Sequence, residues 1–274
     1  MTISDILRQG FHYARTCKSL WLFGFFVGMA GGGSGGGSGG GDGGGGLGLS
    51  PAQFAAIAIV AVLAVGALIV MQFVSEGALI EGVVRARQGR AMTTREGFRA
   101  GWAHWGVLVR IALLYVVAFC GSGGLLVAVC LIALRTAGPL GAVLFGIPAL
   151  LIGVPWLVTL YIVQAFASRI AVLENRNALD AIGKARLFLH GRLMHGLKLL
   201  AAMFVATLAI VVVGLVVLAP VGLVLAALLP VLRTIPVIVL GCLVLLPALY
   251  VLIAVLGMLR SSIWTIGYVT QVES

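Results

Sequence analysis

The chain has 274 residues, of which 61% are apolar and only 9% are charged, and its formal net charge is +10. Soluble domains are about 45–50% apolar and about 25% charged, so a water-soluble monomer of this composition could not cover its own surface with polar groups. These values exclude a disordered chain, a disulfide scaffold and an ordinary cytosolic enzyme. The sequence therefore predicts an all-α, polytopic membrane helix bundle.

The first hydrophobic segment, from Leu20 to Ala30, is short. It can cross about 30 Å of hydrocarbon only with the help of the residues before it or in a thin local bilayer. Residues 31–49 follow as a Gly-rich loop on the non-cytoplasmic side, with 13 glycines between positions 31 and 46. This composition is typical of a flexible spacer, either natural or an engineered linker. It is not a phosphate-binding loop, because no Gly-Lys-Ser/Thr closes it.

Five longer hydrophobic segments follow, and each is long enough to span the membrane. In chain order they cover Phe54–Ile80, Val107–Leu134, Leu140–Ala167, Leu197–Leu218 and Val237–Leu259. We expect a helix start at Pro51 and a helix end at Pro220.

The six segments form one membrane domain over residues 1–274. It divides into an interfacial helix with span one, the Gly-rich loop, spans two and three, spans four and five, and span six with the C-terminal tail. The corresponding ranges are 1–30, 31–49, 50–134, 135–233 and 234–274.

Three cytoplasmic connections begin in the same way. Thr2–Asp5, Thr93–Glu96 and Asn177–Asp180 each place a hydroxyl or amide side chain three residues before a carboxylate, which is a capping-box pattern or its Asp variant. An amphipathic stretch of about 15 residues then leads toward a span. We predict three interfacial helices, each followed by two spans, as a three-fold internal repeat.

The positive charges predict the orientation. Sixteen of the 18 Lys and Arg residues fall on one side of the predicted spans, and only Arg135 and Arg233 fall on the other. The positive-inside rule then places both termini in the cytoplasm, and we expect a bacterial inner-membrane protein. The interfacial helices would contact anionic headgroups or a protein partner, which includes a second copy of the chain, and no nucleic acid is expected. The residues for these contacts are Arg8, Arg15, Lys18, Arg99, Lys184, Arg186 and Arg192.

Glu76 is an acidic residue inside an apolar segment. A carboxylate at that depth is costly unless it is paired or reaches water. Arg110 and Arg169 lie at similar depth on other segments and are its candidate partners. A structural ion pair, a snorkelling side chain and a proton relay are all compatible with the sequence, although no second intramembrane acid is present to receive a proton.

Small residues and prolines interrupt several spans. Gly121–Gly124 lies near the middle of span three, and Pro148 and Pro155 lie in span four. Such residues allow close helix packing, or they line a cavity for an apolar substrate. Trp264 and the other tryptophans near span ends fit the role of interface anchors.

Two short patterns resemble a known family. The run ASRIAVLEN at 167–175 is followed by ALDAI at 178–182, and ALIEG at 78–82 is followed by EGF at 96–98. These look like the six-span bacterial membrane proteins related to the membrane domain of glycerophosphoryl diester phosphodiesterases, over residues 73–200. The resemblance implies a membrane bundle without the soluble catalytic barrel that some members append, and it carries over no catalytic residue.

No catalytic, cofactor or metal motif is present, so we expect a non-enzymatic protein without a cofactor. The leading hypothesis is a membrane-embedded partner, scaffold or lipid-organising subunit. The alternative is a transporter or permease subunit for an apolar or lipid-like substrate. A central polar cavity would favour transport, whereas a closed, dry bundle with an exposed apolar flank would favour assembly.

The predicted topology can be tested by cysteine labelling. In a variant without the four native cysteines, a cysteine placed at Arg90 or Lys184 should stay unlabelled by a membrane-impermeant reagent in intact cells, because both positions are expected in the cytoplasm. Labelling of Arg90→Cys in intact cells would show that the orientation is opposite to the predicted one.

Overall fold

The computed structural model describes residues 8–10, 20–32, 51–90, 92–191, 193–228 and 234–272, and the regular structure in these ranges is helical. This confirms the predicted all-α class. Arg15, Lys18, Arg192 and most of the Gly-rich loop lie outside the described residues. The helices are α2 (Trp21–Gly32), α3 (Pro51–Arg87), α4 (Thr94–Leu173), α5 (Ala178–Leu189), α6 (Leu193–Leu228) and α7 (Thr234–Val272).

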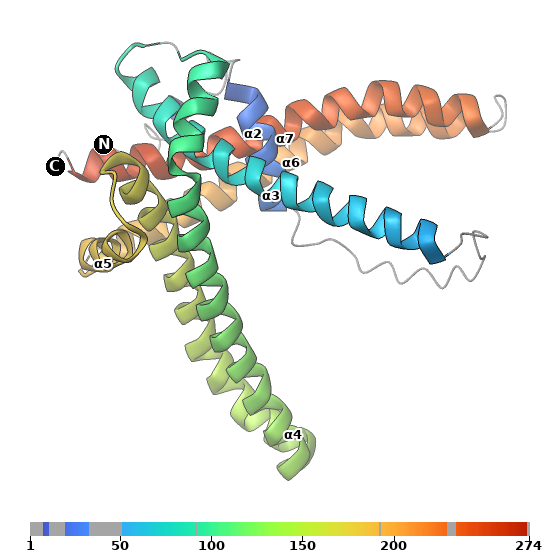
Figure 1. Ribbon diagram of the computed structural model, residues 1–274. Helices are drawn as coiled ribbons and strands as arrows, with labels where there is room; N and C mark the ends of the chain where they lie inside the picture. The colour runs from blue at the N-terminus through green and yellow to red at the C-terminus, as the bar shows by residue number, and fades with distance from the viewer. Residues whose placement is uncertain are drawn as a thin grey trace.

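Helix α4 contains two membrane spans joined by a sharp reversal. Gly138 has φ 64° and ψ −161°, a backbone conformation that glycine adopts far more readily than other residues. The chain turns back on itself near this residue, so the green and yellow-green halves of α4 lie side by side (Figure 1). The turn separates the apolar stretches Thr94–Thr136 and Val143–Leu173.

Five helical stretches are long and apolar enough to cross a membrane, which fits a multi-pass helix bundle. Besides the two halves of α4 they are Ala55–Arg87, Leu193–Ala227 and Val239–Val272. Helix α2 has 12 residues, which at about 1.5 Å per residue gives about 18 Å and falls short of the hydrocarbon thickness. A sixth span, like the three-fold repeat, therefore stays a prediction.

The predicted helix end at Pro220 is wrong, because α6 continues through this residue to Leu228. Proline removes one backbone N–H and usually kinks or breaks a helix in water. In an apolar surrounding, the remaining backbone groups can be satisfied only within the helix, so helical structure continues past the proline.

The capping patterns had different outcomes. At Thr93 the capping box is present: the Thr93 side chain accepts a hydrogen bond from the Glu96 amide, and the Glu96 carboxylate accepts one from the Thr93 amide at 3.0 Å. The helix that starts there is continuous with the following span and is not a separate interfacial helix. Asn177 is the N-cap of the separate helix α5, but its side chain makes no capping hydrogen bond. The pattern at Thr2–Asp5 lies outside the described residues.

The packed centre lies where all the helices meet, and the apolar arms leave it in different directions (Figure 1). Helix α3, the α4 hairpin and the paired helices α6 and α7 form these arms, and most of their apolar side chains are exposed. At the centre, the Phe166 ring stands edge-on to Trp264 with ring centroids 5.4 Å apart. Trp264 is therefore a core residue, only 1% exposed, and the interface-anchor prediction for it is wrong.

Glycines allow backbone contact at two helix crossings. A Cβ atom at Gly257 of α7 would lie 1.9 Å from the Gly24 carbonyl oxygen of α2, and one at Gly101 of α4 would lie 2.0 Å from the Val74 carbonyl oxygen of α3. Both helix pairs can therefore approach only with glycine at these positions. The sequence instead indicated Gly121–Gly124 as a site of close packing. That interpretation is wrong for this chain, since Gly121, Gly123 and Gly124 have open space beside them.

Substitution of Gly257 tests the α2–α7 crossing. We expect Gly257→Ala to lower the free energy of unfolding by about 1–3 kcal/mol, because the new methyl group must displace backbone atoms of α2. Gly124→Ala, in the open part of α4, is the control and should be neutral or slightly stabilising. Thermal unfolding in mild detergent measures both, and equal effects would contradict the crossing.

Candidate functional site

A cavity of about 300 Å³ lies at the packed centre, between α2, α3, α4 and α7. Its wall is polar on three of these helices, and apolar side chains complete it. The polar part consists of Gln72 and Glu76 from α3, Tyr161, Gln164, Ser168 and Arg169 from α4, and Arg260 and Ser261 from α7. Polar groups inside spanning helices are costly and usually face a cavity or one another, so this is the candidate functional site.

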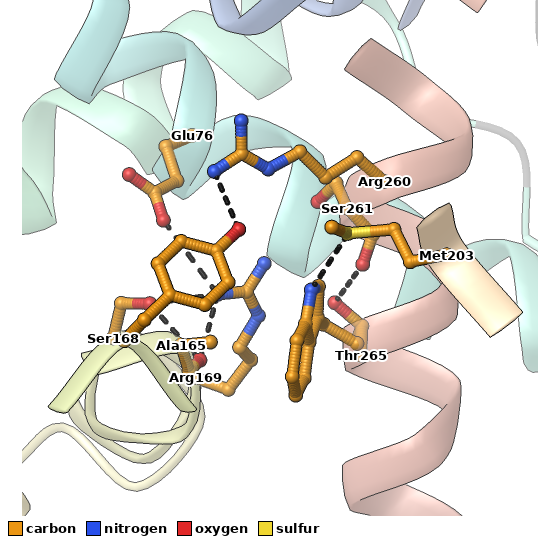
Figure 2. Close-up of polar contacts among 10 residues, drawn as sticks. Glu76, Ala165, Ser168, Arg169, Met203, Arg260, Ser261 and Thr265 are labelled. Atoms are coloured by element: carbon orange, nitrogen blue, oxygen red, sulfur yellow. Dashed lines mark hydrogen bonds and ion pairs between the residues drawn. The ribbon is translucent and has the colours of Figure 1, made fainter. Parts of the chain in front are cut away.

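Arg169 is the most deeply buried charge of the site, with 6% of its side chain exposed. Its Nη1 donates hydrogen bonds to the Ala165 carbonyl at 2.7 Å and to the Ser168 hydroxyl at 2.9 Å. The Glu76 carboxylate lies 3.7 Å from the same nitrogen (Figure 2). Because both Nη1 hydrogens already have acceptors, the contact with Glu76 is an ion pair without a hydrogen bond.

The structure brings Glu76 to Arg169 and not to Arg110. Arg110 is exposed, and it makes no ion pair with Glu76. The Glu76 side chain is 26% exposed, so its carboxylate also borders the cavity. A relay role for Glu76 has no second acid among the described cavity-lining residues.

Arg260 is the second positive charge of the cavity. Its Nη2 donates a hydrogen bond to the Tyr161 hydroxyl at 2.8 Å, and its guanidinium carbon lies 5.8 Å from the Tyr161 ring centroid (Figure 2). The ring of Tyr161 stands edge-on to Trp264, whose indole nitrogen donates to the Met203 sulfur at 3.1 Å. Packing of α4, α6 and α7 thus fixes the position of Arg260.

Two buried polar atoms in the cavity wall have no hydrogen-bond partner among the described residues. They are Nε of Arg169 and Oγ of Ser261. Ser261 is only 1% exposed. An unsatisfied buried polar group costs about 1–3 kcal/mol, so these two atoms are donors that an acceptor bound in the cavity would satisfy.

The sequence interpretation missed Arg260. It ended span six at Leu259 and assigned the following arginine to the cytoplasmic side. Helix α7 in fact runs to Val272, and residues 261–268 are buried. The signal that could have shown this is the apolar and aromatic character of the residues after Arg260, which indicates a helix that stays packed.

A second polar cluster joins the end of α4 to α5 and α7. Glu174 accepts hydrogen bonds from Lys184 and from the Tyr268 hydroxyl, the latter at 2.9 Å, and lies 3.6 Å from the Arg176 Nε. Burial raises the pKa of Glu174, but the hydrogen bonds from Lys184 and Tyr268 outweigh it and hold the pKa below its ordinary value. This cluster is structural and clamps α5 against the centre.

Four of the residues predicted to contact lipid headgroups or a partner are described. Arg8, Arg99 and Arg186 are exposed. Lys184 is exposed too, but it is engaged by Glu174. Headgroup contact therefore stays a prediction for the first three, and Arg15, Lys18 and Arg192 lie outside the described residues.

No family model matches the chain, and no curated protein or solved structure is significantly similar to it. The resemblance to the membrane domain of glycerophosphoryl diester phosphodiesterases therefore stays a prediction. Within the described residues, no group of three or more His, Cys, Asp and Glu side chains could hold a metal ion.

A double-mutant cycle tests the Glu76–Arg169 pair. We expect Glu76→Gln to lower the free energy of unfolding by about 1–3 kcal/mol, because it leaves Arg169 buried without a counter-charge. Adding Arg169→Gln should cost less than the sum of the single changes, whereas adding Arg110→Gln, the control, should be additive. Chemical unfolding in detergent measures the cycle, and strict additivity with Arg169→Gln would disprove the pairing.

Proposed function

We propose that the protein binds a lipid-like amphiphile within the membrane, takes its polar headgroup into the central cavity, and acts as a transporter or permease subunit for it. The single observation that carries this proposal is a polar cavity of about 300 Å³ at the meeting point of apolar helices. Charged residues at such positions are expensive to bury and usually serve a ligand or ion pathway.

The apolar surface next to the cavity favours an amphiphile as the ligand over a water-soluble molecule. Val116 lines the cavity and is 57% exposed. Beyond the packed centre, α3 and the α4 hairpin run in different directions (Figure 1), and both carry exposed apolar side chains such as Ile69 and Leu113. A headgroup in the cavity would leave its hydrocarbon chain against this apolar surface, where burial is favourable.

The size and lining of the cavity argue for binding without chemistry. A volume of 300 Å³ is at the low end of the range for ligand pockets, which is about 300–1,000 Å³, so it suits a headgroup and not a whole lipid. Its described lining contains one carboxylate and no His or Cys. Hydrolysis through a nucleophile and base, or through paired carboxylates, has no support from these residues.

A scaffold or lipid-organising role is the second candidate. The exposed apolar arms favour it, with Leu151 of α4 and Val213 of α6 among the exposed residues. Lipid chains cover such arms in any membrane protein, however, so the arms do not discriminate between the candidates, and the cavity favours substrate binding. We also propose, from the charge distribution, that both termini lie in the cytoplasm of a bacterial inner membrane.

Filling the cavity tests the proposed function. Ala112 lines the cavity on α4, and Ala128 is an exposed residue of the same helix that does not. In liposomes with a fluorescent phosphatidylglycerol quenched from outside, wild-type protein should accelerate lipid transfer between leaflets. Ala112→Phe should slow this transfer roughly tenfold by blocking the headgroup, and Ala128→Phe should leave it unchanged.

Two results would contradict transport. If wild-type vesicles transfer lipid no faster than protein-free vesicles, but native mass spectrometry finds lipid that Ala112→Phe loses, the lipid-organising role replaces transport. If both variants retain as much lipid as the wild type, the cavity is not the binding site.

A further inference from the structure

The charges around the central cavity define the kind of headgroup it would accept. This argument rests on the proposed function, because it takes the cavity as a binding site. Arg169 and Arg260 face a single described carboxylate, Glu76, so the site carries one uncompensated positive charge. We infer that the cavity binds a singly charged phosphate-type oxyanion, such as the phosphodiester of a lipid headgroup that has no cation of its own.

The remaining polar groups supply hydrogen-bond donors. Gln72 and Gln164 bring amide groups to the wall, and Ser261 brings a hydroxyl group. The Ser168 hydroxyl already donates to the Ala165 carbonyl at 3.2 Å. Oxyanions accept several hydrogen bonds at once and are bound most strongly by charged donors. A wall with one carboxylate and several hydrogen-bond donors therefore favours binding of an anion over binding of a cation.

The unpartnered atoms point to the same ligand. The Arg169 side chain is more than nine-tenths buried, yet its Nε has no acceptor, and the Oγ of Ser261 on the facing helix has none. Both residues line the cavity. An acceptor-rich group between α4 and α7 would satisfy donors that the described residues leave unpaired.

Glu76 is the counter-ion of Arg169 in the cavity wall. Its carboxylate lies 3.7 Å from Arg169 and makes no hydrogen bond to it. An incoming oxyanion would compete with this carboxylate for the same positive charge and would be repelled by it. Substitution of the acidic residue and of the basic residue should therefore have opposite effects on anion affinity. Loss of Glu76 should strengthen anion binding, and loss of Arg260 should weaken it.

The experiment measures dissociation constants for delipidated protein in a neutral detergent. The probes are short-chain phosphatidylglycerol, which is anionic, short-chain phosphatidylcholine, which adds a cation to the same phosphodiester, and inorganic phosphate, which has no hydrocarbon chain. Wild-type protein should bind phosphatidylglycerol at least tenfold more tightly than phosphatidylcholine. Tighter binding of inorganic phosphate than of phosphatidylglycerol would keep the oxyanion site but assign it to a soluble anion.

Three variants test the residues. Arg260→Gln should weaken binding of phosphatidylglycerol roughly tenfold or more, and should weaken binding of phosphatidylcholine by a smaller factor because its own cation already balances the phosphodiester. Glu76→Gln should tighten binding of phosphatidylglycerol several-fold, and it keeps the test valid if Arg260→Gln does not fold. Arg110→Gln removes an exposed charge of α4 outside the cavity lining and should have no effect.

Two outcomes separate this inference from the proposed function. Equal affinity for both lipids, with weaker binding after Glu76→Gln, would overturn the oxyanion site while lipid binding stands. Failure of the wild-type protein to bind either lipid would overturn the proposed function, and the headgroup assignment with it.

Discussion

Arg169 imposes the constraint on which the centre of this molecule depends. Only 6% of the Arg169 side chain is exposed, and an isolated charge at such a buried position would be prohibitively costly. The carbonyl of its own helix, a neighbouring serine and the Glu76 carboxylate share its charge. The positions of α3 and α4 relative to each other follow from this requirement as much as from apolar packing.

Glycine contacts allow the polar side chains of separate helices to meet. At Gly101 the backbones of α3 and α4 touch, and at Gly257 those of α2 and α7 do so. Bulkier residues would hold these helices farther apart and would separate the polar side chains of the cavity wall. Close packing and the convergence of these side chains are therefore two results of the same arrangement.

The sequence predicted the features that depend on local composition. Apolar runs identified the long apolar helices, and the Thr93 capping box was correct because its contacts lie within four residues. The depth of Glu76 in its segment indicated an ion pair with Arg110 or Arg169, and only the structure shows that the partner is Arg169. Features that depend on neighbours far along the chain were not predicted. Arg260 looked like the end of a span because nothing local shows that α4 supplies Tyr161 to hold it.

The prediction of close packing at Gly121–Gly124 failed for a similar reason, and the glycine contact at Gly257 was not predicted. Gly121–Gly124 drew attention because four small residues stand together, but a dense cluster matters only where another helix crosses it. Gly257 has no glycine close to it in its apolar segment, and only the approach of Gly24 and Gly28 from the first hydrophobic segment leaves no room for a larger residue there. Packing partners of this kind are decided by the tertiary arrangement, which spacing along one helix does not reveal.

The contacts of Glu174 with Lys184 and Tyr268 make part of the attachment of α5 dependent on pH. The carboxylate form is the one that Lys184 and Tyr268 hold, and its pKa in the folded protein lies below the ordinary value. Its stabilising effect is therefore fully present above the unfolded pKa and disappears as the pH falls through the folded pKa. Acidification through the folded pKa would therefore weaken the polar contacts that hold α5, while Ala181, Ala185 and Leu189 of this helix stay packed in the core.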